Sequence, residues 1–180
     1  CKSEEVEWMW EHYRRQVRVK KNHKLFSPYI ERWVDHYVAT DLEEPFPFTQ
    51  ALGANTAPIW ARAKYLTRQI RVPLIEVNPR VSLWRIGRAL NMQKSHLRFH
   101  KHQIDGEVAR KAFLSELIER DIAFLYEQDI RILVENIEAF DAFLCALTAV
   151  LQFKGQCEER TRDLPATGGW IEIPKADIIW

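Results

Sequence analysis

The fold is decided mainly by residues 136–152, NIEAFDAFLCALTAVLQ. The spacing of apolar residues predicts a buried helix over about 137–153. Glu138 and Asp141 lie three positions apart near its start, so they share one helix face. Acids in a first helical turn also favour the helix dipole, which is an equally good explanation of Glu138. The helix dipole explains Asp141 less well, because apolar residues follow it directly. Small residues recur later in the helix, as in a helix packed closely against a sheet.

Length and composition set broad limits on the protein. A chain of 180 residues predicts a single domain covering residues 1–180. The 26 Lys plus Arg nearly balance the 25 Asp plus Glu, which argues against a surface built as a whole for polyanions but allows a local basic groove. The three cysteines form no spaced framework, so we expect a reducing, cytoplasmic setting. No apolar run approaches the roughly 20 residues of a membrane helix.

Further elements are predicted on both sides of this helix. Prolines predict that segment 25–50 is irregular and that RWVDHY (32–37) lies in a loop. A lone strand needs neighbours on both edges, so we expect sheet partners upstream of Cys1 or within segment 25–50. The order of elements predicts an α/β chain with few strands for its size. The predicted helices span 4–19, 56–70, 82–91, 107–127 and 137–153, and the predicted strands span 72–79 and 170–173.

A third carboxylate, Glu76, lies within the predicted buried strand PLIEVNP (73–79). In a strand it shares a face with Leu74 and Asn78. A charge beside apolar residues is costly unless it is paired or binds a metal. Ligands gather at the carboxyl ends of strands in α/β folds. The alternative, a strand-end acid paired with Arg80 or capping a helix, has equal support from the sequence.

Three motifs together resemble the domain-of-unknown-function family 429. They are LIEVNP (74–79), IEAFDAFLCALTAVLQFKG (137–155) and GGWIEIP (168–174), and the resemblance covers about residues 56–174. The family consists of predicted nucleases with a ribonuclease H-like fold. The resemblance therefore implies a central mixed sheet flanked by helices. The final helix alone is also similar to the last helix of RuvC-type resolvases.

The resemblance implies a carboxylate site for divalent metal. Glu76 would match the fourth-strand acid, and Asp141 with Glu138 the acids of the last helix. Such carboxylates are suitable ligands for Mg²⁺ or Mn²⁺. The bound ions could then catalyse the hydrolysis of nucleic-acid phosphodiesters. The family's first strand and its Asp have no counterpart before residue 56, so we expect a chain truncated at its N-terminus. The alternative is a non-catalytic scaffold that binds nucleic acid or protein and has lost the metal site.

Basic residues supply candidate contacts to nucleic acid. The run from Arg14 to Lys24 lies beside Trp8 and Trp10, a combination that can bind phosphates and stack bases. A solvated charged face is the more common explanation of such a run. His96 and His100 have a spacing that zinc can use, but no zincin pattern accompanies them. The candidate nucleic-acid contacts are Arg14, Arg15, Arg18, Lys20, Lys21, Arg32 and Lys94.

Overall fold

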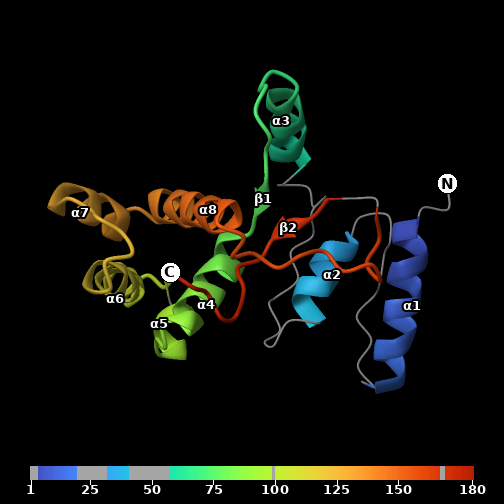
Figure 1. Cartoon of the computed structure of the whole chain (residues 1–180), viewed down its shortest axis with the longest axis horizontal. Coiled ribbons are helices and arrows are strands. Elements are labelled where there is room, and N and C mark those ends of the chain that lie inside the picture. The colour runs from blue at the N-terminus through green and yellow to red at the C-terminus, as the bar shows by residue number, and fades with distance from the viewer. Residues whose placement is uncertain (1–3, 20–31, 41–56, 99, 167–168) are drawn as a thin grey trace. The chain divides into compact units, whose positions relative to one another are not determined.

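The computed structural model describes residues 4–19, 32–40, 57–98, 100–166 and 169–180, and its described part is mainly helical (Figure 1). The chain divides into two compact units. The first contains Cys1–Glu76 and Arg160–Trp170, and the second contains Val77–Glu159 and Ile171–Trp180. None of the helices that the structure describes has the length and apolar character needed to cross a membrane.

The first unit is built on an aromatic core. Its helices are α1 (Glu4–Val19), α2 (Trp33–Thr40) and α3 (Ala57–Thr67). Trp33 is only 1% exposed and stacks on Trp170, with ring centroids 6.1 Å apart. Trp8 of α1 meets Trp33 edge-on at 5.6 Å. These contacts hold α1, α2 and the segment around Trp170 together, because aromatic pairs bury large areas in well-defined orientations.

Helix α2 corrects the prediction of a loop at RWVDHY. Trp33, Val34 and Val38 are all buried, at spacings that place them on one side of a short helix. Tyr37 also lies 5.9 Å from Trp170. The helix therefore depends on tertiary packing with distant aromatic residues, which a local reading of the sequence does not include.

The sheet is much smaller than predicted. Strands β1 (Glu76–Val77) and β2 (Ile171–Glu172) pair in parallel as a two-stranded sheet. Leu74 and Ile75 are exposed, at 52% and 36%, so the prediction of a buried strand over 72–79 was wrong in both length and burial. Apolar side chains alone do not make a strand, because each edge also needs a hydrogen-bonding neighbour.

Helix α4 (Pro79–Ala89) is the centre of the second unit. Every residue from Val81 to Gly87 is buried. The helix begins sharply because the Asn78 side chain accepts hydrogen bonds from the backbone N–H groups of Arg80 and Val81, at 3.1 and 3.4 Å. Pro79 at the first helical position needs no hydrogen-bond acceptor.

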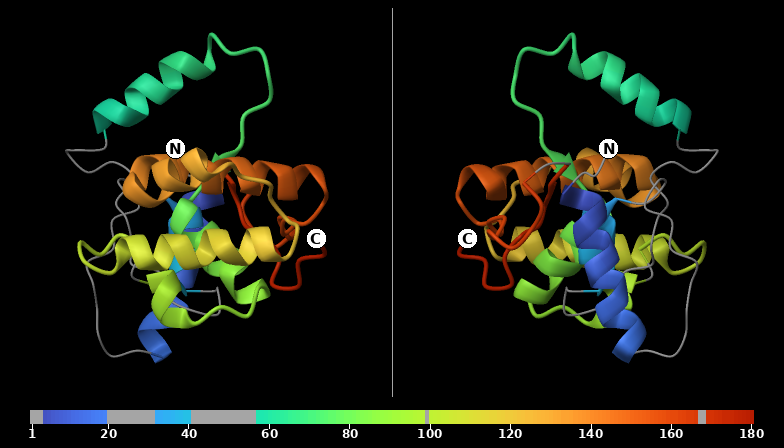
Figure 2. Two further views of the ribbon diagram at one scale, coloured as in Figure 1. Left: turned by 90° about the vertical axis from the view of Figure 1, so that its left-hand side faces the viewer. Right: turned by 90° about the vertical axis from the view of Figure 1, so that its right-hand side faces the viewer.

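Four further helices pack with α4 in a continuous series. Helix α4 packs against α5 and α8, α5 against α6, and α7 against both α6 and α8 (Figures 1 and 2). The prediction of a helix over 137–153 is confirmed by α8, whose first turn is capped by the Asn136 side chain on the Ala139 N–H at 2.8 Å. The bounds are Lys94–Arg98 for α5, Gly106–Glu119 for α6, Glu127–Glu135 for α7 and Ile137–Phe153 for α8.

The predicted helix over 107–127 is interrupted. Helix α6 stops because Asp121 adopts a left-handed conformation with φ of 56°. The Asp121 and Ile122 N–H groups then bond back to the carbonyls of Ile118 and Leu117, at 3.0 and 2.9 Å, in a Schellman motif. Glycine usually occupies this position, so an aspartate there gives little indication in the sequence that the helix ends.

A buried hydroxyl pair connects α4 and α8. The Thr148 Oγ1 lies 2.8 Å from both the Ser82 Oγ and the Leu144 carbonyl oxygen, and both side chains are fully buried. Arg85 of α4 is also buried and pairs with Glu158 at 2.9 Å. Each of these buried polar groups therefore has a partner, as stability requires.

Cys157 is buried directly after α8. It forms an isolated antiparallel bridge with Pro174, and its thiol lies 3.9 Å from the Thr148 carbonyl oxygen. Burial first, and then the negative charges of Glu172 and Glu158, raise the pKa of the thiol to about 12, although Lys175 opposes this. The thiol is therefore protonated in the folded protein at every physiological pH.

We predict that Cys157→Ala reduces the loss of unfolding free energy that the protein undergoes at alkaline pH. The folded pKa of about 12 exceeds the ordinary value of 9.0. The stabilisation from the protonated thiol is thus complete below about pH 9 and is lost as the pH rises from 9 towards 12. Urea unfolding at pH 8 and pH 10 should show a smaller loss of unfolding free energy in the variant than in the wild type. Equal losses would contradict this role.

Candidate metal-binding site

Asp141 lies at the N-terminal rim of the buried face of α8. Phe140, Leu144 and Thr148 form that face and are fully buried. Thr148 follows Asp141 by seven residues, which is about two helical turns, so both point in nearly the same direction. The Asp141 side chain is 23% exposed. Asp141 therefore lies where the buried face of α8 meets solvent.

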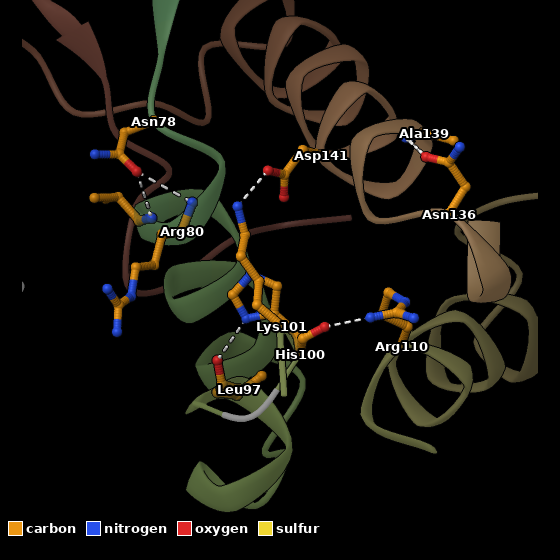
Figure 3. Close-up of polar contacts among 10 residues, drawn as sticks. Asn78, Arg80, Leu97, His100, Lys101, Arg110, Asn136, Ala139 and Asp141 are labelled. Carbon is orange, nitrogen blue, oxygen red and sulfur yellow. Dashed lines mark hydrogen bonds and ion pairs between the residues drawn. The ribbon is translucent and has the colours of Figure 1, made fainter. Parts of the chain in front are cut away.

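The two carboxylate oxygens of Asp141 have different surroundings. Oδ2 lies 2.5 Å from the Lys101 Nζ (Figure 3). Oδ1 is buried and has no hydrogen-bond partner among the residues that the structure describes. Leaving a buried polar atom unpaired costs about 1–3 kcal/mol. Such atoms are rare in folded proteins, and a divalent cation requires an available oxygen of this kind.

His100 directly precedes Lys101 in the chain and is 2% exposed. Its Nδ1 lies 3.3 Å from the Leu97 carbonyl oxygen, so Nδ1 carries the hydrogen (Figure 3). Burial lowers the pKa of the imidazole, the Asp141 charge and the contact with Leu97 raise it, and Lys101 and Arg80 lower it further. The net shift is downward, so the ring is neutral at pH 7. Its Nε2 is then an acceptor, and no described residue donates to it.

The backbone beside Lys101 is held by a buried arginine. The Arg110 guanidinium donates to the His100 carbonyl oxygen at 2.5 Å (Figure 3) and to the Val134 carbonyl oxygen at 2.7 Å. A side chain at Gly106 would crowd this contact, because its Cβ would lie 2.9 Å from the guanidinium and 3.0 Å from the His100 oxygen. The chain that carries Lys101 is thus fixed to α6 and to the end of α7.

Glu138 lies one turn before Asp141 on α8 and is exposed. Asn136 already supplies the side-chain cap of this helix. Glu138 is therefore not needed as the cap, although its charge still suits the helix dipole. Its position permits the predicted role of a second oxygen ligand beside Asp141.

Glu76 belongs to an ion-pair network in the first unit. The Arg32 Nη1 lies 2.8 Å from each Glu76 oxygen, and the same guanidinium bonds Asp35 at 2.9 and 3.0 Å. Burial alone would lower the pKa of Arg32, but the hydrogen bonds and charges of Asp35 and Glu76 raise it. Arg32 is thus held by two carboxylates, and a phosphate contact would have to replace one of them.

The predicted meeting of Glu76 and Asp141 stays a prediction, because these residues belong to different compact units. Within the described part of the chain, no three or more His, Cys, Asp or Glu side chains form a group able to hold a metal ion. The structure does bring Asp141 together with Lys101 and His100. Neither of the latter was a predicted site residue.

The predicted nucleic-acid contacts are only partly described. Arg14, Arg15 and Arg18 belong to α1, but their side chains lie outside the described part, as do Lys20 and Lys21 entirely. Lys94 begins α5, and its Nζ lies 5.7 Å from the centre of the Trp84 ring. Arg98 of the same helix lies 5.8 Å from that ring.

Comparison with known families gives a match over most of the chain. The model of the family described as "Protein of unknown function (DUF429)" matches residues 50–166, which is more than half of the chain. This chain belongs to the DUF429 family. The resemblance to this family is thereby confirmed over a region that contains two of the three motifs, and the third, at 168–174, lies beyond the match. No curated protein and no solved structure matches this DUF429 protein.

We predict that Asp141 limits the stability of the fold. Asp141→Ala removes the buried, unpaired Oδ1 and a half-exposed ion pair worth at most about 1 kcal/mol. The free energy of unfolding should therefore stay unchanged or rise by about 1 kcal/mol in chemical denaturation. Glu158→Ala is the control. It leaves the buried Arg85 without its ion-pair partner and should lower the same quantity by about 3 kcal/mol. A comparable loss in Asp141→Ala would show that the carboxylate is structural.

Proposed function

We propose that this DUF429 protein is a divalent-metal-dependent nuclease that hydrolyses nucleic-acid phosphodiesters on a ribonuclease H-like architecture. The observation that carries the proposal is the buried, unpaired Oδ1 of Asp141. It occurs at the residue that the sequence resemblance assigns to the metal site. Family membership supports the same assignment through the motifs that contain Glu76 and Asp141.

The residues fit Mg²⁺ or Mn²⁺. Both ions prefer carboxylate oxygens and water as ligands. Asp141 would be a direct ligand through Oδ1, with Glu138, one turn away on α8, as a second ligand or an orienting group. Glu76 would contribute from β1 after releasing Arg32. A bound divalent cation would supply an activated water and neutralise charge on the phosphate.

The reaction itself is a simple displacement at phosphorus. The oxygen of one water molecule bonds to phosphorus as one ester P–O bond breaks. The released oxygen takes a proton and becomes a hydroxyl group, and the other product keeps the phosphate as a monoester. The contribution of the chain is to hold the Asp141 carboxylate in place through α8, beside the Lys101 ammonium.

Contacts to the nucleic acid would come from basic residues. Lys94 and Arg98 of α5 present two cations near one aromatic ring, that of Trp84. Cations in such an arrangement attract the phosphate backbone of nucleic acid irrespective of its sequence. The basic residues of α1 that were predicted from the sequence would add further phosphate contacts.

We predict that Asp141→Asn abolishes metal-dependent cleavage. Single-stranded and double-stranded DNA and RNA are incubated with the protein and Mg²⁺ or Mn²⁺. The variant should cleave at least roughly 100-fold more slowly, because the amide replaces a charged metal ligand. Asp177→Asn, a change at an exposed aspartate of the same unit, is the matched control and should cleave at the wild-type rate.

Two outcomes would contradict the nuclease proposal. Equal cleavage by the wild type and Asp141→Asn would remove Asp141 from the site. Absence of cleavage by the wild type, together with no rise in its Tm on addition of either ion, would favour the non-catalytic scaffold. A ligand that binds only the folded state must raise its stability.

A further inference from the structure

The ion pair between Lys101 and Asp141 joins the turn after α5 to the second turn of α8. The Lys101 side chain is 51% exposed. An ion pair this accessible to water adds little to stability. Arg110 already fixes the turn through the His100 carbonyl oxygen. The fold therefore does not need Lys101 to hold the turn in place. The close contact of Lys101 with Asp141 calls for another explanation.

The backbone of Lys101 is held in place, whereas its side chain is free to change conformation. Its backbone follows His100, which is held by Arg110 and by the contact of its own ring with Leu97. The side chain beyond is a flexible four-carbon stem that ends in a compact ammonium. The ammonium can therefore move by several ångströms while the backbone stays in place.

Electrostatics make the position of this ammonium sensitive to a metal ion. An ammonium and a divalent cation are attracted to the same carboxylate and repel each other. At Asp141 the ammonium is held by Oδ2, while the neighbouring Oδ1 has no partner among the described residues. A cation that enters at Oδ1 would therefore weaken the hold of Asp141 on Lys101.

We propose that Lys101 is a phosphate-binding residue that exchanges with the divalent cation at Asp141. Without metal, the ammonium neutralises Asp141 and keeps it oriented. With metal, the ammonium turns to a non-bridging oxygen of the phosphate that the cation attracts. Lysine suits this role because it binds phosphate as a point charge from a flexible stem. The inference rests on the proposed function and deepens it, since it adds a substrate-binding group and a competing internal cation to the same site.

Lys101→Met tests both parts of the exchange. Removing the competing charge should tighten Mn²⁺ binding to the substrate-free protein by about tenfold, measured by isothermal titration calorimetry. Removing the phosphate contact should slow cleavage at saturating Mn²⁺ by at least about tenfold. Lys101→Arg keeps the charge and should lie between the wild type and Lys101→Met in both measurements. Lys111→Met, at an exposed lysine of α6, should match the wild type in both.

The outcomes separate this inference from the proposed function. If the wild type binds Mn²⁺ and cleaves while Lys101→Met equals it in either affinity or rate, the exchange is overturned and the nuclease proposal stands. If the wild type neither binds Mn²⁺ nor cleaves, both are overturned. An unchanged circular dichroism spectrum and Tm in Lys101→Met establish that the differences do not arise from unfolding.

Discussion

The second unit depends on the contact between α4 and α8, where the Thr148 and Ser82 hydroxyl groups meet in a fully buried position. Buried hydroxyl groups must find partners, so this pair favours one rotation of α8 about its axis. Because Asp141 lies two turns before Thr148 on the same face, that rotation also directs Asp141 inwards. Packing in the centre of the unit thus determines where the carboxylate of the candidate site lies.

The distribution of unsatisfied groups distinguishes the candidate site from the rest of the unit. Elsewhere, buried charges have partners: Arg85 pairs with Glu158, and Arg110 donates to two carbonyl oxygens. At the site, Asp141 keeps an oxygen without a donor, and His100 keeps a free Nε2, within the described residues. Among the described residues of this second unit, the atoms left unpaired lie at one place, and stability is sacrificed there. Functional sites commonly show this trade-off.

Sequence reasoning succeeded where the signals are local. The bounds of α8 followed from apolar spacing, and the family followed from three short motifs. The prediction failed where distant contacts decide the structure. Helix α2 depends on packing against Trp170, and α6 ends at a left-handed Asp121 that resembles any other helical residue in the sequence. Lys101 was missed because forty residues separate it from Asp141, and an exposed lysine carries no pattern of its own.

The most direct test of a metal ion at Asp141 is paramagnetic broadening of amide NMR signals by Mn²⁺. Bound Mn²⁺ broadens signals from nearby nuclei, so it reports the position of the ion independently of catalysis. Substoichiometric Mn²⁺ should selectively broaden the amide signals of residues 138–142 and Lys101, and Asp141→Asn should abolish that selectivity. Uniform weak broadening, or selective broadening that persists unchanged in Asp141→Asn, would contradict a metal site at this carboxylate.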